Sequence, residues 1–504
     1  MNKGYYITTA IAYVNSPPHI GFAYEVIGAD IMARFQRLRG RETFFLTGSD
    51  EHSLNVYRKA KEANLSPQQY CDQMADLYIE TWKKLGISYN RFIRTSSEEH
   101  KKAVNVLVDK LRKTPYVYRG KYAGWYCISC ENFYSEKELI DGLCPIHKRK
   151  PEWVEEENYF FALSKFEDFL KELILENPEF IEPEERRNEV IGILKEGLRD
   201  VSISRKGTAW GIPFPGTDNE RVYVWVDALI NYLSGIGYGW ESSNFDKFWP
   251  ADIHIIGKDI IRFHCLLWPA LLKAVGLPLP HKVFIHGFIN LEGEKISSTR
   301  GNILSPEELL KEYPPDALRF YLFREIPFGQ DGDFSLKNLK ERYNRELAND
   351  WGNLFRRTVI MLDKYLEGKI PSRQGFEGKD REIKSLSEKV FEKVTENMEN
   401  LKFSQALIEI WKLVKRANQY VEENAPWKLY QIKDFKNLER VLYNTLEMIR
   451  VVAILLLPFL PFSSKKILED LGVEGSSWEE AKIWGKLPPR RKVPVSPPIF
   501  PRKK

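Results

Sequence analysis

Apolar positions near the start of the chain predict a strand followed by a helix. The run 5–14 is strand-like, and after a polar, proline-containing turn apolar residues recur at helical spacing over 27–38, up to a stop at Gly40. His19 and Gly21 lie where this helix begins. A strand that leads into a helix N-terminus brings free N–H groups and the helix dipole to one point, which favours phosphate. We therefore expect a phosphate site, with His19 as a donor and Gly21 allowing close approach.

The rest of the N-terminal part continues this alternation. A second strand is expected at 44–47 and helices near 66–85 and 97–113. Later strands are expected at 221–226 and 254–256, the second leading into a helix over 260–275. Strands alternating with helices are typical of an α/β fold with a doubly wound parallel sheet, whose ligands bind at the carboxyl ends of the strands.

Two other regions have a different pattern. The segment 151–205 is charged and helical, with a short return strand expected at 158–161. From residue 338 onward nearly all apolar positions follow a 3.6-residue period, which predicts a helix bundle. The tail 488–504 is basic and rich in proline, and we expect it to wrap around the domain or to fray.

Composition narrows the class of protein. With 504 residues and 43% hydrophobic residues the chain should form several domains with large cores. The net charge is only +5 despite 75 basic residues, so the surface is mixed, as expected for local contact with RNA and for many soluble proteins. No signal peptide is evident, and the most apolar run, 451–462, is too short to cross a membrane. We expect a cytoplasmic protein without a membrane or DNA partner.

Three of the five cysteines fall in one short segment. Cys127 and Cys130 form one Cys-x-x-Cys pair, and Cys144 with His147 forms a second pair of the same spacing. Two such pairs on adjacent turns can place four ligands tetrahedrally, as structural zinc requires. The odd number and clustering of the cysteines argue for a metal in a reducing compartment, not for disulfides. A structural zinc knuckle over 127–147 is therefore predicted.

A second nucleotide motif lies far downstream. A lone His-x-Gly is weak evidence, but residues 295–302 read Lys-Ile-Ser-Ser-Thr-Arg-Gly-Asn, a hydroxyl-rich loop with a lysine. Together the two stretches resemble the HIGH and KMSKS signatures of class I aminoacyl-tRNA synthetases. The surrounding residues narrow the resemblance to methionyl-tRNA synthetases of the bacterial type with a single zinc knuckle, and it covers nearly the whole chain.

The resemblance implies a domain order. The segments are a Rossmann-like catalytic domain (1–115 and 206–290), an inserted connective peptide with the knuckle (116–205), a connecting fold with the lysine loop (291–345), a helix-bundle anticodon-binding domain (346–487) and the tail (488–504). The distance between the two nucleotide motifs is too short for the large editing insert of the leucine, isoleucine and valine enzymes.

The resemblance also implies which residues bind each substrate. ATP would be held, with magnesium, by His19, Gly21, Gly257, Asp259, Lys295, Ser297 and Ser298, of which His19 and Lys295 act in catalysis. Methionine would lie among Ala10, Ile11, Tyr13, Trp225, Ala228, Leu229, Tyr232, Ile260 and His264, with its ammonium group on Asp50. The Tyr13 hydroxyl and a His264 N–H are expected to face the sulfur, because an apolar wall alone distinguishes a methylene weakly. Arg205 matches a position that orients this region.

Several of these residues have an ordinary structural interpretation when taken singly. Asp50 could be an acidic helix cap, Trp225 on a buried strand could be core, and His264 could be a buried histidine with its hydrogen bonds satisfied. Their joint match in order and spacing favours the pocket. Ser53 stands where the family usually has glycine.

The C-terminal half implies recognition of tRNA. Asn353 and Arg357 lie one helical turn apart and can bind base edges, while Trp427 offers a surface on which a base can stack. The implied function is that of a methionine–tRNA ligase, which forms methionyl-adenylate from methionine and ATP, releases pyrophosphate and charges tRNA(Met) for initiation and elongation. A separate tRNA-binding subunit is a possible further partner.

Two other classes of function fit parts of the sequence. A non-catalytic tRNA-binding protein would have no use for a methionine pocket. A synthetase for another small apolar amino acid, or a related nucleotidyl transferase, would not require Trp225, His264, the zinc knuckle and Trp427 together. Both are therefore less consistent with the sequence.

Two departures from the signatures lie on the catalytic path. Phe22 replaces the second histidine and Ser298 the second lysine. Charge-assisted hydrogen bonds are roughly twice as strong as neutral ones, so nearby cations such as Lys258 or Arg300 would have to compensate. We predict that Arg300→Ala slows methionine-dependent exchange of pyrophosphate into ATP. An unchanged exchange rate would rule out compensation by Arg300.

Overall fold

The structure is a computed structural model that describes residues 4–128, 132–134, 136–145, 148–206, 209–295 and 304–504. The chain divides into two compact units, each considered by itself below. The first comprises residues 1–29, 43–82 and 88–288, and the second comprises 30–42, 83–87 and 289–504. In the described residues, no helix combines the length and the apolarity needed to span a bilayer.

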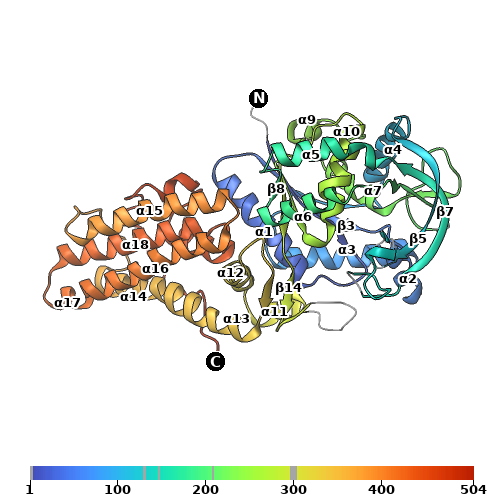
Figure 1. The fold of residues 1–504 in the computed structure, drawn as a ribbon. Helices are drawn as coiled ribbons and strands as arrows, with labels where there is room; N and C mark the ends of the chain where they lie inside the picture. Colours follow the sequence, from blue (N-terminus) through green and yellow to red (C-terminus); the bar gives the residue numbers. More distant parts are fainter. Residues whose placement is uncertain (1–3, 129–131, 135, 146–147, 207–208, 296–303) are drawn as a thin grey trace. The chain divides into compact units, whose positions relative to one another are not determined.

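A parallel sheet forms the centre of the first unit and confirms the predicted fold class (Figure 1). All its pairings are parallel, so the carboxyl ends of its strands meet at one edge. The main path through the sheet is β2 (Ala12–Tyr13), β3 (Thr43–Asp50), β1 (Tyr5–Thr9), β12 (Ile253–Gly257), β13 (Val283–His286) and β8 (Ile181–Glu182), and β4 (Arg91–Arg94) pairs with β3.

The first helices agree with the sequence pattern. They are α1 (Ile20–Leu38), α3 (Pro67–Lys84) and α4 (Glu98–Arg112). The chain leaves α1 at Gly40, whose φ of +78° suits glycine. The predicted strand 5–14 is instead divided into β1 and β2, because the backbone N–H of Ala10 bonds to Ile255 in β12 and β2 then pairs with the end of β3.

The predicted strand 221–226 is wrong. A short strand, β11 (Glu220–Val222), pairs with β10 (Ser204–Lys206), and the chain then forms helix α7 (Val224–Leu229). The β-branched residues of this stretch favour a strand only locally, and Asp227, buried between two histidines, fixes the helix through tertiary contacts. Trp225 therefore lies on a helix.

The predicted helix 260–275 is also irregular. It consists of a 3₁₀ turn, η3 (Lys258–Ile260), a π-helical turn, η4 (Phe263–Leu267), and α10 (Trp268–Ala274). Pro269 lies inside this stretch and lacks the N–H that a continuous α-helix would need, which accounts for a wider turn just before it.

The inserted segment forms an antiparallel sheet in the order β6 (Asn132–Tyr134), β5 (Val117–Cys127), β7 (Glu152–Phe161) and β9 (Val201–Ser202). In Figure 1, β5 and β7 form a long curved ribbon. The return strand expected at 158–161 is confirmed but starts earlier, since β7 pairs with β5 from Glu152 onward and carries charged residues on its exposed positions. Helices α5 (Glu167–Glu176) and α6 (Glu184–Lys195) follow it.

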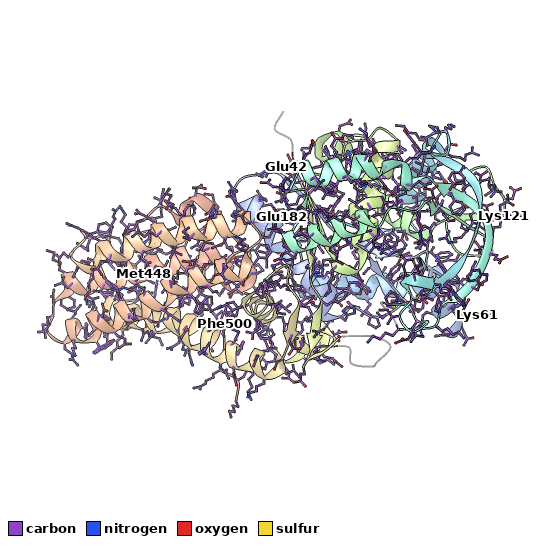
Figure 2. All side chains as sticks on the ribbon, in the orientation of Figure 1. Glu42, Lys61, Lys121, Glu182, Met448 and Phe500 are labelled. Atoms are coloured by element: carbon purple, nitrogen blue, oxygen red, sulfur yellow. The ribbon has the colours of Figure 1, made fainter. Side chains whose placement is uncertain are left out.

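The second unit confirms the predicted helix bundle. Met448, labelled in Figure 2, is fully buried inside it. Before the bundle lie a small sheet of β15 (Glu294–Lys295), β14 (Ile289–Leu291) and β16 (Gly332–Phe334), and helices α11 (Pro306–Glu312) and α12 (Pro315–Glu325). The later helices are α13 (Leu336–Arg342), π-helical η5 (Tyr343–Gly352), α14 (Asn353–Leu366), α15 (Lys379–Glu399), α16 (Phe403–Asn424), α17 (Pro426–Gln431), α18 (Phe435–Leu456) and α19 (Pro461–Asp470).

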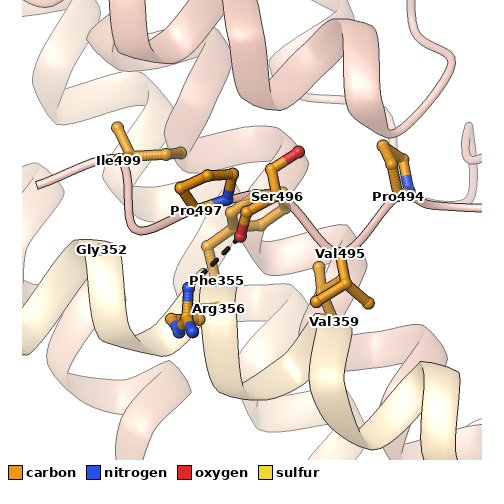
Figure 3. A pocket seen from close by; sticks show the side chains of 9 residues that line it. All are labelled: Gly352, Phe355, Arg356, Val359, Pro494, Val495, Ser496, Pro497 and Ile499. Carbon is orange, nitrogen blue, oxygen red and sulfur yellow. Dashed lines mark hydrogen bonds between the residues drawn. The ribbon is translucent and has the colours of Figure 1, made fainter.

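The proline-rich tail wraps along η5 and α14. Figure 3 shows its residues 494–499 beside α14, where Arg356 donates to the carbonyl of Ser496 at 3.3 Å. Farther along, the side-chain amide of Asn344 exchanges two hydrogen bonds with the backbone of Lys503, of 2.9 and 2.8 Å. The tail is thus held by hydrogen bonds to its backbone, and these do not depend on its charged side chains.

Candidate active site

His19 is the residue from which α1 starts. Its carbonyl accepts the first helical hydrogen bond, from Ala23, at 3.0 Å. The backbone N–H of Gly21 donates to Nδ1 of His19 at 3.1 Å, so in the neutral ring the proton sits on Nε2. A Cβ at position 21 would lie 3.0 Å from the imidazole, which explains why glycine fits there. His19 is therefore set as a neutral donor at a helix N-terminus.

Burial fixes the charge state of this histidine. It lowers the pKa of His19 to about 4, so the ring is neutral near pH 7. Phe22, which replaces the second histidine of the signature, stacks on His19 with ring centroids 4.3 Å apart. The phenylalanine cannot donate to phosphate, but it holds the donating ring in place.

An acidic and basic pair lies at the same edge of the sheet. His286, which ends β13, contacts Glu25 of α1 through Nε2 at 2.9 Å, and its Nδ1 lies 2.8 Å from the carbonyl of Gly287. Burial alone would lower the pKa of His286, but the hydrogen bond and charge of Glu25 raise it overall. Gly257 ends the neighbouring strand, and a Cβ there would meet Asp259 at 2.7 Å. Sequence reasoning found Gly257 and Asp259 but missed the buried pair.

Aromatic rings stack beside the strand ends and form what is called the aromatic wall below. Trp225 of α7 lies parallel to Phe263 of η4 with centroids 3.9 Å apart, and Tyr13 of β2 meets Trp225 edge-on at 5.8 Å. Asp50, almost fully buried, ends β3 opposite Tyr13. The helix cap is not Asp50 but Ser53, whose hydroxyl accepts from Val56 at the start of α2 (Leu54–Glu62). Phe263 was missed, because nothing in the sequence marks the register of a π-helix.

His264 does not offer an N–H to a ligand as expected. Its Nδ1 lies 3.1 Å from the carbonyl of Ile260 and its Nε2 lies 2.7 Å from the Tyr232 hydroxyl. Since a carbonyl can only accept, Nδ1 carries the proton and Nε2 accepts from Tyr232. Burial lowers the pKa of His264 to about 4, which agrees with a neutral ring. The histidine thus orients Tyr232.

The remaining predicted pocket residues lie on the same elements. Ala10 and Ile11 connect β1 to β2, Ala228 and Leu229 follow Trp225 on α7, and Ile260 ends η3. Arg205 is nearly buried and binds the carbonyls of Ser202 and Ser204, with its guanidinium 4.0 Å from the ring of Tyr223. Arg205 therefore holds together the hairpin that precedes α7.

Two of the four predicted zinc ligands are described. Cys127 and Cys144 are both buried and belong to one small cluster with Tyr134, against which Trp125 and Leu139 pack. Cys130 and His147 lie outside the described residues. Within the described part of the chain, no three potential ligands gather into a metal site. Two soft sulfur donors in one dry cluster fit the donor set of structural zinc.

The lysine loop falls mostly outside the described residues. Lys295 ends β15, whose backbone pairs with Asn290 of β14. Ser297, Ser298 and Arg300 are not described, so their roles stay predictions. Lys258 lies over the ring of Phe288, with Nζ 4.4 Å from the ring centroid.

The expected anticodon readers lie on two helices of the second unit. Asn353 starts α14 and is exposed, and Arg357 follows one turn later. Arg357 donates to Glu422 at 2.5 Å and to the side chain of Asn418 at 3.2 Å. Trp427 is half-buried in the first turn of α17. A base that hydrogen-bonds to the guanidinium of Arg357 would compete for it with the carboxylate of Glu422.

Comparison with known proteins identifies the family. The family model described as tRNA synthetases class I (M) matches residues 5–151 and 135–359. A second family model, described as the anticodon binding domain of methionyl tRNA ligase, matches residues 370–503. The chain is 45% identical over 501 residues to the methionine–tRNA ligase of Thermotoga maritima, covering 98% of this chain and 80% of that protein. The chain belongs to the methionyl-tRNA synthetase family.

Other relatives agree with this. The methionine–tRNA ligase of Caldanaerobacter subterraneus is 46% identical over 506 residues, covering 100% of this chain and 79% of that protein. The Mycobacterium tuberculosis methionyl-tRNA synthetase in complex with methionyl-adenylate is 40% identical, with a TM-score of 0.96 over 99% of this chain and 100% of that one. The chain is therefore an ATP-dependent class I aminoacyl-tRNA ligase with a Rossmann-like domain and a helical anticodon-binding domain, and the interpretation as a synthetase for another amino acid is excluded.

The protonation of His19 can be tested directly. We predict that nitrogen NMR of histidine-labelled protein shows the Nε2–H form at pH 7 and a titration midpoint near the pKa of about 4 that burial produces. The signal is assigned by its loss in His19→Gln, which should also slow pyrophosphate exchange by roughly 10²–10³-fold, as for other lost transition-state donors. A midpoint near 6.5, or an Nδ1–H ring, would contradict this geometry.

Proposed function

We propose that the chain activates L-methionine with ATP and transfers it to tRNA(Met) through the residues described above, for both initiation and elongation. The observation that carries this proposal is the neutral, Nε2-protonated His19 at the start of α1, on the same sheet edge as the Trp225–Phe263 wall. The related Mycobacterium tuberculosis enzyme, solved with methionyl-adenylate, supports it. The reaction belongs to translation, and we place it in the cytoplasm.

In the first step a carboxylate oxygen of methionine attacks the α-phosphorus of ATP. The new P–O bond gives methionyl-adenylate, and the bond to pyrophosphate breaks with its electron pair on the leaving group. Fixed donors act most strongly where negative charge develops. We assign His19 Nε2–H and the first N–H groups of α1 to the phosphates, and Gly257 and Asp259, at the neighbouring strand end, to the adenosine. Lys295 and the hydroxyls of Ser297 and Ser298 are proposed for the leaving group.

Methionine would bind between Asp50 and the aromatic wall. The Asp50 carboxylate would pair with its ammonium group, while Tyr13, Trp225 and Phe263 would surround the thioether, which aromatic edges favour. Tyr232 donates a hydrogen bond from its hydroxyl to Nε2 of His264, so toward a ligand this hydroxyl could act only as an acceptor. Selectivity for sulfur over a methylene would then rest on Tyr13 and on the orientation of Tyr232.

In the second step a ribose hydroxyl of the tRNA attacks the methionyl carbonyl carbon. The ester C–O bond forms, the mixed-anhydride bond breaks with its electrons on AMP, and the ribose proton passes to solvent. Anticodon recognition is assigned to Asn353, Arg357 and Trp427, whose edges and ring suit unpaired bases.

Two metals are part of this proposal. Magnesium accompanies ATP, where a divalent cation neutralises phosphate charge. The donor set Cys127, Cys130, Cys144 and His147 fits structural zinc, which would hold the knuckle. Trp125 and Tyr134 beside the described cysteines would cover it.

The activation step is tested by exchange of labelled pyrophosphate into ATP without tRNA, with each of the twenty amino acids. We expect exchange with methionine and a decrease of about tenfold or more in kcat/KM when Tyr232 is changed to Phe, since loss of a buried hydrogen-bonding group is costly. Ile483→Ala, at an exposed position of the second unit, is the matched control and should be unaffected. No exchange with any amino acid would favour a non-catalytic tRNA-binding protein.

The zinc site is tested by metal content, independently of activity. Purified protein should hold about one zinc per chain, and Cys127→Ala should lose it, because a structural site needs all four ligands. Cys71→Ala removes another buried thiol outside the cluster and should keep the metal. Zinc retained in Cys127→Ala, or absent from the unmodified protein, would refute the assignment.

A further inference from the structure

A cavity of about 200 Å³ lies in the first unit beside the aromatic wall. One side of it is formed by the inserted sheet, where Glu152, Val154 and Glu156 of β7 face inward at every second position. Another side is formed by the β10–β11 hairpin and by Val224, next to Trp225. The proposed function assigns neither methionine nor ATP to this cavity.

His52 places a ring nitrogen at this cavity. Its Nδ1 lies 2.7 Å from a carboxylate oxygen of the buried Asp227, so in the neutral ring Nδ1 carries the proton. Nε2, on the far side of the ring, makes no hydrogen bond with any residue that the structure describes, and His52 lines the cavity. A buried carboxylate thus fixes the imidazole and leaves Nε2 as the nitrogen that can accept a hydrogen bond.

Asp227, which holds His52, is itself held by further buried side chains. The second oxygen of Asp227 lies 2.7 Å from Nε2 of His100 in α4, and Nδ1 of His100 lies 2.8 Å from the hydroxyl of Ser234 in α8 (Asn231–Ser234). These side chains are almost fully buried. Burial alone would raise the pKa of Asp227, but the two histidines lower it to about 2, so it remains a carboxylate.

The other lining groups suit a nucleotide. The half-buried indole of Trp210 is fixed by its N–H, which donates to the carbonyl of Glu51 at 2.6 Å, and it meets His52 edge-on at 5.2 Å. Lys206 and Arg221 bring positive charge to the hairpin side, while Glu152 and Glu156 bring negative charge to the side formed by β7. A flat ring and hydrogen-bond acceptors are the elements that recognise an unpaired base, and the cations on the hairpin side are the groups that suit its phosphate. The volume is below that of most sites for whole small molecules, which suits one base better than a complete cofactor.

We propose that this cavity receives one unpaired nucleotide of the tRNA acceptor end, with Trp210 stacking on the base and His52 Nε2 accepting a hydrogen bond from it. The inference rests on the proposed function, because the tRNA ribose has to reach the methionyl carbonyl. His52 lies two residues after Asp50, the proposed ammonium ligand, and Val224 lies one before Trp225. A nucleotide held there would be next to the amino acid site.

Two substitutions on β7 distinguish the effect of filling the cavity from the effect of adding a large side chain elsewhere on the strand. Val154→Trp fills the cavity, whereas Glu155→Trp adds the same side chain on the opposite, exposed face of β7. We expect the single-turnover rate of transfer from enzyme-bound methionyl-adenylate to tRNA(Met), relative to the pyrophosphate exchange rate, to fall about tenfold in Val154→Trp, as for loss of a stacked base. Glu155→Trp should leave this ratio as it is.

A second measurement changes the tRNA and compares the unmodified enzyme with Val154→Trp. Transcripts of tRNA(Met) in which the unpaired 3′ nucleotides are made abasic one at a time should show one position where transfer by the unmodified enzyme slows similarly. In the Val154→Trp enzyme, the abasic change at that position should slow transfer little further, because both changes remove the same interaction.

Several results would overturn the inference. An equal loss of exchange and transfer in Val154→Trp would assign the cavity to amino acid activation. No loss in Val154→Trp, the same loss in Glu155→Trp, or no sensitive abasic position would exclude a nucleotide there. Failure of the proposed function would give a different result, because the unmodified protein would then show no methionine-dependent exchange of pyrophosphate into ATP.

Discussion

The buried carboxylate of Asp227 is the constraint that connects the parts of this site. A charge in the protein interior is tolerated only with partners, and Asp227 has one histidine on each oxygen, one from the segment after β3 and one from α4. Its backbone belongs to α7, which carries Trp225. One hydrogen-bond network therefore sets the spacing between the strand that presents Asp50 and the helix that presents the aromatic wall. The strong β propensity around Trp225 is overridden for the same reason.

The sheet supplies the other half of the arrangement by joining distant segments. Thr8 of β1 and His254 of β12 are linked by a buried hydrogen bond of 2.7 Å, and the ring of Tyr232 stacks on His254 with centroids 4.1 Å apart. Parallel pairing puts the ends of these strands at one edge, where α1 begins and where Gly257 ends β12. Groups far apart in the sequence, such as His19 and Gly257, are thus brought to one edge of the sheet.

The sequence was sufficient where a signal is local. His19 at a helix start, the parallel sheet and the helix bundle all follow from short patterns and from resemblance to a family. It was insufficient where tertiary contacts decide: α7 in place of a strand, the Glu25–His286 pair, and the use of both His264 nitrogens within the protein. A histidine in a sequence does not reveal which nitrogen is occupied, because that depends on neighbours such as Ile260 and Tyr232.

The π-helical turn η4 has a consequence for how this family can vary. A π-turn corresponds to an α-helix with one residue added, and such added residues are frequent at functional sites. Removal of one residue here would restore regular winding and rotate every preceding side chain by about 100° around the helix axis. Phe263 would then leave Trp225, although the hydrophobic core beyond Trp268 could stay in place. Substitutions can change the shape of this aromatic wall gradually, whereas a change in the length of η4 would displace Phe263 in a single step.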